Sequence, residues 1–417
     1  MRFLVLSGIL LLLSPVVTAQ SGDLVKLIYA EKFSGTVING EAVRIFEGNV
    51  HVERDGVNLY CNRMTEFTSQ NVVHAVGNVK IIDGNETLTS DFGKYYPETR
   101  FTEVTRNVRL VSGSNTLTSE SGQFSFLTNK AKFWKNTRMV DSTGTIILAD
   151  TLFYDRQTRQ SRLVGGVSIE SPADRTLILG SEADHDARTL QSAITGRPLF
   201  IQWPEDATGD TLFISGTRLF ADRRDSVNQF KAMGKARFLQ GNLAADSDTM
   251  LIYRSTGLID LRRNPQVWFE NNQVTADTIH ILTNGNELRE MRCFGTGFSA
   301  SVYDSVNGKF NQMKGQSLIY RFMERKIWQI EVNGTAESIY HLDDQGQPSG
   351  ANEISGDRLL IFFSAGEVDR IRVTGGVEGK LLPEKQIVTD PVRLRGFSWN
   401  ADRRPTRQEF YRTRVHE

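Results

Sequence analysis

The stretch GNVKIIDGNETLTSDFGKYY, residues 77–96, carries the pattern that decides the fold. Val79 and Ile81 alternate with polar residues, which is typical of a β-strand with one buried face. Asp-Gly-Asn at 83–85 is a turn sequence. The run Leu-Thr-Ser-Asp at 88–91 then places the apolar and the small residue on one face and the acid on the other, toward solvent. The stretch therefore predicts two antiparallel strands joined by a hairpin.

The same pattern recurs at a fixed distance. Gly48-Asn49-Val50, Gly77-Asn78-Val79 and Asn107-Val108 each lie 29 residues after the one before, and weaker copies continue at 29 to 41 residues, giving about eleven repeats. Repeats of this length mark a stacked array in which each unit buries its apolar face against its neighbours. Because helical spacing is absent from the chain, we predict an elongated all-β solenoid of stacked antiparallel strands. In it, Gly-Asn and Asp-Gly both act as hairpin turns.

The first residues have the features of an export signal. Arg2 is followed by an apolar run from Leu4 to Leu13 and by the small-residue ending Val-Thr-Ala at 17–19. An apolar run of this length is too short to span a bilayer, which needs about 20 residues. We therefore expect residues 1–19 to be a signal peptide that is cleaved after Ala19, and the mature chain to be exported and soluble.

Charge and cysteine content exclude two classes of protein. The chain has 49 basic and 49 acidic residues, and the repeats contain no basic stripe, so nucleic-acid binding is not expected. Cys61 and Cys293 are far apart in the sequence, which excludes a disulfide framework. We interpret Cys61 as a small residue that fills the core.

Motifs for catalysis and metal binding are missing. The six histidines are scattered without metal-ligand spacing, and the sequence contains no nucleophile elbow and no phosphate-binding loop. The acid of each repeat could supply paired carboxylates for glycoside hydrolysis, but a residue that recurs in every repeat is better explained by a structural or solubility role. We therefore predict no catalytic residue, no metal and no cofactor.

The paired phrases Gly-Asn-Val-x-Val and Leu-x-Ser/Ala-Asp-x-x-x-Tyr, behind a signal peptide, resemble the LptA/OstA family of periplasmic lipopolysaccharide-transport proteins. Residues 20–170 carry the strong copies, 171–382 continue the rhythm in degenerate form, and 383–417 form a basic tail that could be a cap, a partner-binding arm or partly disordered. The resemblance implies a β-jellyroll of two facing sheets with a hydrophobic groove. It also implies a periplasmic location, with association with the outer membrane left open.

In such a groove, the acyl chains of lipid A would lie between the two sheets. Small residues recurring along one line, such as Ser90 and Ala149, would leave room for them. The residues that we expect to line the groove are Val50, Val52, Val79, Ile81, Leu88, Ser90, Phe92, Val108, Leu110, Leu117, Ile147, Ala149 and Phe153.

The resemblance also implies end-to-end assembly with other lipopolysaccharide-transport proteins into a bridge to the outer membrane. Free strand edges near 25–33 and 371–381 would pair with the edges of those partners. The alternative interpretation is a parallel β-helix, as in adhesins and polysaccharide-processing proteins. The drifting period and the hairpin turns favour antiparallel pairing over that alternative.

Overall fold

The computed structural model describes residues 25–412, except 208, 225–227, 254, 285–286, 345–346 and 388–390. The predicted signal peptide therefore lies outside the described residues. The chain divides into two units between Pro198 and Leu199, within the segment 171–382 of degenerate repeats. We call them the N-terminal unit and the C-terminal unit, and each is described by itself.

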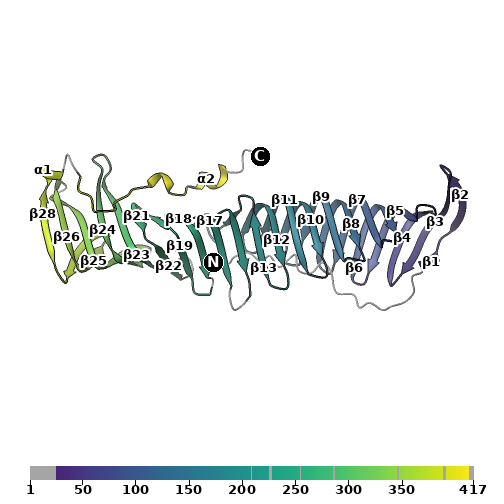
Figure 1. Cartoon of the computed structure of the whole chain (residues 1–417), viewed down its shortest axis with the longest axis horizontal. Coiled ribbons are helices and arrows are strands. Elements are labelled where there is room, and N and C mark those ends of the chain that lie inside the picture. Colours follow the sequence, from purple (N-terminus) through teal and green to yellow (C-terminus); the bar gives the residue numbers. More distant parts are fainter. Residues whose placement is uncertain are drawn as a thin grey trace. The chain divides into compact units, whose positions relative to one another are not determined.

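The N-terminal unit is built of strands that follow one another in chain order, side by side (Figure 1). Its strands are β1 Lys26–Tyr29, β2 Lys32–Ile38, β3 Glu41–Arg54, β4 Val57–Phe67, β5 Val72–Asp83, β6 Glu86–Tyr96, β7 Phe101–Ser112, β8 Asn115–Ser125, β9 Lys130–Val140, β10 Ile146–Asp155, β11 Gln160–Ser171, β12 Thr176–Asp186 and β13 Gln191–Thr195.

The C-terminal unit continues with shorter strands and then four long ones, β23 to β26. Its strands are β14 Leu199–Gln202, β15 Leu212–Ser215, β16 Arg218–Asp222, β17 Gln229–Gln240, β18 Leu243–Tyr253, β19 Leu258–Arg262, β20 Gln266–Phe269, β21 Asn272–Thr275, β22 Thr278–Asn284, β23 Glu287–Asp304, β24 Lys309–Met323, β25 Lys326–Asp344, β26 Gln347–Ser364, β27 Glu367–Thr374 and β28 Glu378–Pro383. Helix α1 Glu384–Ile387, a 3-10 helix Ala401–Arg403 and α2 Arg407–Arg412 follow.

Neighbouring strands pair in antiparallel fashion throughout both described units, as in β3 with β4 and β24 with β25. The predicted all-β array of stacked antiparallel strands is therefore confirmed, and the parallel β-helix alternative is wrong. The Asp-Gly hairpin is confirmed as well, because β3 ends at Arg54 and β4 begins at Val57. No helix among the described residues is long and apolar enough to cross a membrane.

The expectation that Gly-Asn forms hairpin turns is wrong. Gly77-Asn78 lie inside β5, and both residues have positive φ. The register between β5 and β6 shifts between Val76 and Val79, and equivalent shifts occur at the other Gly-Asn positions. Each pair is thus a bulge of two residues at which one long strand bends. The 29-residue period is the distance from one bent strand to the next strand with the same direction.

The acid of each repeat holds the bulge of the following strand. Asn107 Nδ2 donates to Asp91 Oδ2 at 2.8 Å, and Asn136 Nδ2 donates to Glu120 Oε1 at 2.7 Å. At Gly165 a Cβ atom would lie 2.1 Å from Oδ2 of Asp150, so this acid packs directly over the backbone. The recurring acid therefore has a structural role, and in the first strong copy Asn62 takes the same place beside Gly77 and Asn78.

The core of the N-terminal unit lies between the two halves of its bent strands. Val50 and Val52 of β3 pack in one cluster with Met64 of β4 and Ala75 of β5, which lie on the other side of the bend. Cys61 is also in this cluster as a free, buried cysteine, and burial raises the pKa of its thiol to about 11. The interpretation of Cys61 as a core residue is confirmed.

Candidate functional site: an apolar interior pocket

A row of aliphatic side chains runs across the N-terminal unit, one from β1 and one from each of β3 to β12. These residues are register partners on neighbouring strands, and from Val52 onward their side chains face the interior. We call this set the aliphatic row: Leu27, Val52, Leu59, Ile81, Leu88, Leu110, Leu117, Met139, Ile147, Ile169 and Ile178.

A second row faces it from the other halves of the bent strands. Tyr95, Thr102, Phe124, Ala131, Tyr154 and Ser161 are register partners in the same way, and we call them the opposing row. Between the two rows lies a third set of inward positions where Gly93 and Gly122 alternate with Val104 and Phe133. A Cβ atom at Gly122 would lie 2.8 Å from the Phe133 ring, so the missing side chain is what makes room for the ring.

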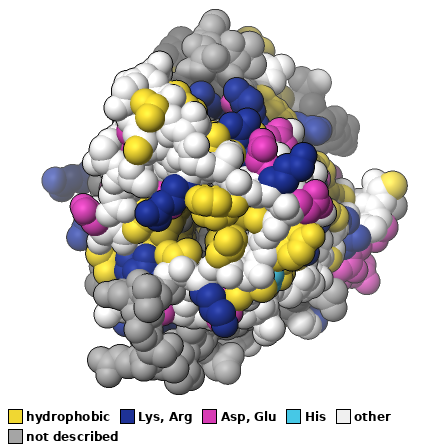
Figure 2. All heavy atoms as spheres, turned by 90° about the vertical axis from the view of Figure 1, so that its right-hand side faces the viewer, with side chains coloured by type: hydrophobic (Ala, Val, Ile, Leu, Met, Phe, Trp, Pro, Cys, Tyr) yellow, Lys and Arg dark blue, Asp and Glu magenta, His cyan; other side chains and the backbone are white. Residues whose placement is uncertain are grey.

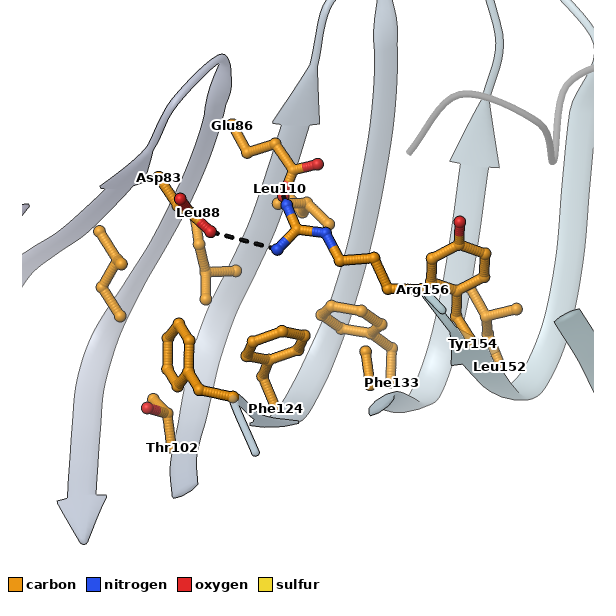
Figure 3. A pocket seen from close by; sticks show the side chains of 13 residues that line it. Asp83, Glu86, Leu88, Thr102, Leu110, Phe124, Phe133, Leu152, Tyr154 and Arg156 are labelled. Atoms are coloured by element: carbon orange, nitrogen blue, oxygen red, sulfur yellow. Dashed lines mark hydrogen bonds and ion pairs between the residues drawn. The ribbon is translucent and has the colours of Figure 1, made fainter. Parts of the chain in front are cut away.

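The two rows enclose a pocket (Figure 3). From the aliphatic row it takes Ile81, Leu88 and Leu110, and from the opposing row Thr102, Phe124, Ala131 and Tyr154. The remaining lining residues are Asp83, Glu86, Phe126, Phe133, Leu152 and Arg156. Burial raises the pKa of the Tyr154 hydroxyl, so this ring stays neutral at physiological pH. Away from Asp83, Glu86 and Arg156, the pocket lining is therefore uncharged and mainly apolar.

Charged residues gather at one border of the pocket. Arg156, directly after β10, donates from Nη1 to Asp83 Oδ2 at 3.3 Å and from Nη2 to Glu86 Oε2 at 3.2 Å. Figure 3 shows the Arg156 side chain reaching toward these two carboxylates, which lie at the hairpin between β5 and β6. These bonds connect two rows of hairpins. The hairpin between β5 and β6 belongs to the row next to the aliphatic row, and the hairpin after β10 belongs to the row next to the opposing row.

Two further contacts join the same rows of hairpins. Arg54 Nη1 donates to the Tyr95 hydroxyl at 2.7 Å, and Arg100 forms an ion pair with Asp55. The seam between the two hairpin rows is therefore bridged by polar side chains at several strands. We call the Arg156 contact, with Asp83 and Glu86, the seam clasp.

The predicted groove residues fall into three sets. Val52, Ile81, Leu88, Leu110, Leu117 and Ile147 belong to the aliphatic row, and three of these line the pocket. Val50, Val79, Ser90, Val108 and Ala149 are buried next to the bulges, where the valines face small partners such as Ser90 and Ser119. Whether any of these residues contacts lipid stays a prediction.

Phe92 and Phe153 lie on the outer face instead. Phe153 is 41% exposed, and the Lys132 ammonium lies 5.4 Å from its ring centre. Phe92 packs edge-on against His74, while its neighbour Gly93 points inward against Val79. The physical reason is the bulge: it shifts the inward positions by one residue, so Leu152 and Tyr154 replace Phe153 in the interior.

Sequence reasoning missed the opposing row, although a signal for it exists. Tyr95, Phe124 and Tyr154 each follow the small residue of the repeat, Ser90, Ser119 or Ala149, by five residues. An odd spacing would place them on the outer face of a straight strand, but the bulge in between returns them to the interior.

The pocket lining is suited to apolar contact. Among the described residues, no group of three His, Cys, Asp or Glu side chains is arranged to hold a metal ion. The polar groups at the seam clasp are engaged with one another, and the lining otherwise offers apolar contact. Transfer of apolar surface from water to such a lining stabilises a complex by about 25 cal/mol per Å².

Comparison with known proteins finds a family match to part of the chain. Residues 23–177 match the family model of the OstA-like protein. No curated protein matches the sequence. Among solved structures, the chain is similar to LptH, the LptA homologous periplasmic component of the lipopolysaccharide transport device of Pseudomonas aeruginosa, at 12% identity and a TM-score of 0.26.

That likeness covers 34% of this chain and 95% of LptH. The family match and the strong copies of the repeat lie in the same part of the chain. Over residues 23–177, the chain is similar to the OstA-like family.

Proposed function

We propose that the N-terminal unit binds the acyl chains of lipopolysaccharide in its interior and passes the lipid toward the outer membrane, without catalysis. The observation that carries this proposal is the aliphatic row facing an apolar pocket, in a segment that matches the OstA-like family. Each methylene that leaves water contributes about 0.8 kcal/mol, so contact with acyl chains needs no specific polar group. Successive strands repeat the same surface, which suits the movement of a lipid from one set of contacts to the next.

The end of the N-terminal unit supports assembly with a neighbouring protein. In the described part of the chain, β1 and β2 pair with β3 and with no further strand, so their outer backbone groups form a sheet edge. Phe33 and Val37 are 63% and 66% exposed on this edge. Figure 2 views the molecule from this end and shows hydrophobic side chains gathered at its centre. Leu27, the first residue of the aliphatic row, is exposed here as well.

We infer that a partner with a similar sheet adds its edge strand to β1 and β2, so that its own interior row continues the aliphatic row. In the C-terminal unit, β27 and β28 both pair with β26 and form the corresponding edge. The proposal includes export to the periplasm through residues 1–19 and other lipopolysaccharide-transport proteins as partners. Deletion of residues 25–38 is expected to abolish capture of such partners, whereas unchanged capture would contradict this part.

A pocket-filling substitution tests the lipid proposal. Ala131→Phe adds a ring inside the pocket, next to Phe124 and Tyr154, whereas Ser168→Phe adds the same ring on the outward side of β11, between two buried residues. We expect binding of purified lipopolysaccharide to fall at least about tenfold in the first variant and to stay within about twofold in the second. Equal binding by a folded Ala131→Phe variant would contradict the proposal. Binding to neutral phospholipid vesicles is measured as well. This comparison distinguishes binding of lipopolysaccharide from binding of lipid in general.

A further inference from the structure

The C-terminal segment of the chain is held on the C-terminal unit by side chains of the sheet. Residues 391–411, which we call the tail, run back from the end of β28 past β24, β21 and β18 (Figure 1). The tail crosses these strands, so its backbone cannot join their ladders. Its N–H and C=O groups need partners from side chains instead.

Two buried glutamines supply those partners. Gln312 Nε2 donates to the Val392 carbonyl at 2.9 Å, and the Leu394 N–H donates to Gln312 Oε1 at 2.9 Å. Gln273 does the same one step further along: its Nε2 donates to the Ser398 carbonyl at 2.9 Å, and the Asn400 N–H donates to its Oε1 at 2.7 Å. Each glutamine side-chain amide thus forms two hydrogen bonds with the tail backbone, one on either side of a single tail residue.

The spacing of the glutamines dictates the shape of the tail. Gln273 is the register partner of Ala300, which is the register partner of Gln312, so the two amides lie two strands apart in one row. Strands are about 4.8 Å apart, so this separation is about 10 Å, whereas six extended residues span about 20 Å. The tail shortens its path by a turn, in which Gly396 has a φ of 94° and the Phe397 N–H donates to the Leu394 carbonyl at 3.1 Å.

Apolar side chains of the tail pack between and beside the two amides. Leu394 is buried, and Phe397 and Trp399 pack on Phe310, with ring centres 5.2 and 4.9 Å apart. Further along, Phe410 of α2 stacks on Phe213 of β15 at 5.4 Å. Aromatic contacts therefore hold the tail on the sheet at Phe397 and Trp399 and again at Phe410.

The arginines of the tail are engaged with the same unit. Arg403 forms an ion pair of 3.1 Å with Asp246, and Arg404 donates to the carbonyls of Glu270 and Asn242 at 3.0 Å. The Arg393 guanidinium lies 5.1 Å from the ring centre of Phe310. The basic character of the tail thus matches acceptors on its own sheet.

We propose that this face of the C-terminal unit is a peptide-binding site, which recognises a peptide of apolar and arginine residues with a glycine turn between two backbone anchors. A buried amide without hydrogen bonds destabilises a fold, so two buried glutamines in one row are explained by the peptide backbone that they bind. The tail in cis is the occupant of the site. When the tail is released, the site accepts the same peptide in trans. This proposal is independent of lipid binding.

The first experiment measures hydrogen exchange in the full chain. Gln273→Leu and Gln312→Leu together are expected to speed exchange of the Leu394 and Asn400 amides by at least about tenfold relative to the wild type. Gln316→Leu, an exposed position on the same strand as Gln312, is the matched control and should leave both amides protected. Unchanged protection in the double variant would overturn the proposal.

The second experiment asks whether the site accepts a separate peptide. In the full chain, Leu394→Asp with Phe397→Asp removes the apolar anchors and is expected to release the tail. A fluorescent peptide of residues 391–411 should then bind saturably, whereas the same peptide with Gly396→Val should bind at least about tenfold more weakly. Addition of Gln312→Leu should abolish binding.

Two results would overturn the proposal in this experiment. One is the absence of peptide binding to the released variant when circular dichroism shows an intact sheet, and the other is binding that Gln312→Leu does not change. Should the released variant not fold, the exchange of the Leu394 and Asn400 amides decides the question by itself.

Discussion

Arg156 and Glu86 form an ion pair with 3.2 Å between Nη2 and Oε2, although 70 residues separate them in the chain. Only 11% of the Arg156 side chain and 8% of the Glu86 side chain are exposed. The pair joins the hairpin before β6 to the hairpin after β10, directly beside the apolar pocket. The border of the proposed lipid site is thus held by a contact that is both buried and distant in sequence.

Removal of Arg156 should destabilise the N-terminal unit. Arg156→Met leaves two carboxylates beside an apolar pocket without their cation, and loss of one partner of a buried pair costs about 3 to 5 kcal/mol. We expect the free energy of unfolding, measured with urea, to fall by about 3 kcal/mol. The matched control is Arg162→Met, whose ion pair with Glu182 is about half exposed and should contribute less than about 1 kcal/mol. Equal effects of the two substitutions would show that the seam clasp does not hold the two hairpin rows together.

The two glycines of one bulge should differ in their tolerance of a side chain. Gly165 and Gly166 both have positive φ, but only at Gly165 would a Cβ atom meet Asp150. Gly165→Ala is therefore expected to lower the free energy of unfolding by about 2 kcal/mol or more. Gly166→Asn introduces asparagine, which is the residue at the equivalent position of the preceding bulge, Asn136. It should change the free energy of unfolding by less than about 0.5 kcal/mol. Thermal unfolding of both variants checks this, and a tolerant Gly165 would contradict the role given to the acid.

Acid should destabilise the C-terminal unit through His341. Burial lowers the pKa of this histidine, with Lys309 and Arg393 acting in the same direction, against Glu384 and Asp304. Because the folded pKa lies below the unfolded value of about 6.5, the unfolded state takes up the proton first as pH falls. The stability is therefore complete above about pH 6.5 and decreases as pH falls from there through the folded pKa. His341→Gln should flatten this dependence in urea unfolding followed at several pH values, and an unchanged slope would contradict it.

Much of the N-terminal unit follows from period-two alternation and the 29-residue repeat. Residues such as Leu88, Leu110 and Ile147 were identifiable because each lies a fixed number of residues from its turn, and the structure places them in one row. The strands themselves and the Asp-Gly hairpins follow from local sequence for the same reason.

Which residues face the interior on the far side of a bulge could not be predicted in the same way. Gly-Asn reads as a hairpin turn in isolation, because both a hairpin and a bulge use positive φ. Only the pairing of neighbouring strands shows that the strand continues, and this decides whether Phe153 or Tyr154 faces the interior.

The docking of the tail depends on contacts that local patterns do not encode. Gln273 and Ser398 are 125 residues apart, and Gln312 and Leu394 are 82 residues apart. The arginines of this segment are conspicuous in the sequence, but their acceptors, such as Asp246, belong to strands whose repeats are degenerate. The predicted basic tail could therefore be located from composition, while its position on the fold could not.

Photo-cross-linking in intact cells tests the central claim most directly. A benzophenone side chain at Leu110 would lie in the pocket, and one at Arg109, the preceding residue, would face solvent. The account predicts that the probe at Leu110 captures lipopolysaccharide and that the probe at Arg109 does not. Failure of the Leu110 probe to capture lipopolysaccharide in a folded, exported chain, or equal capture at both positions, would contradict binding of acyl chains in the interior of the N-terminal unit.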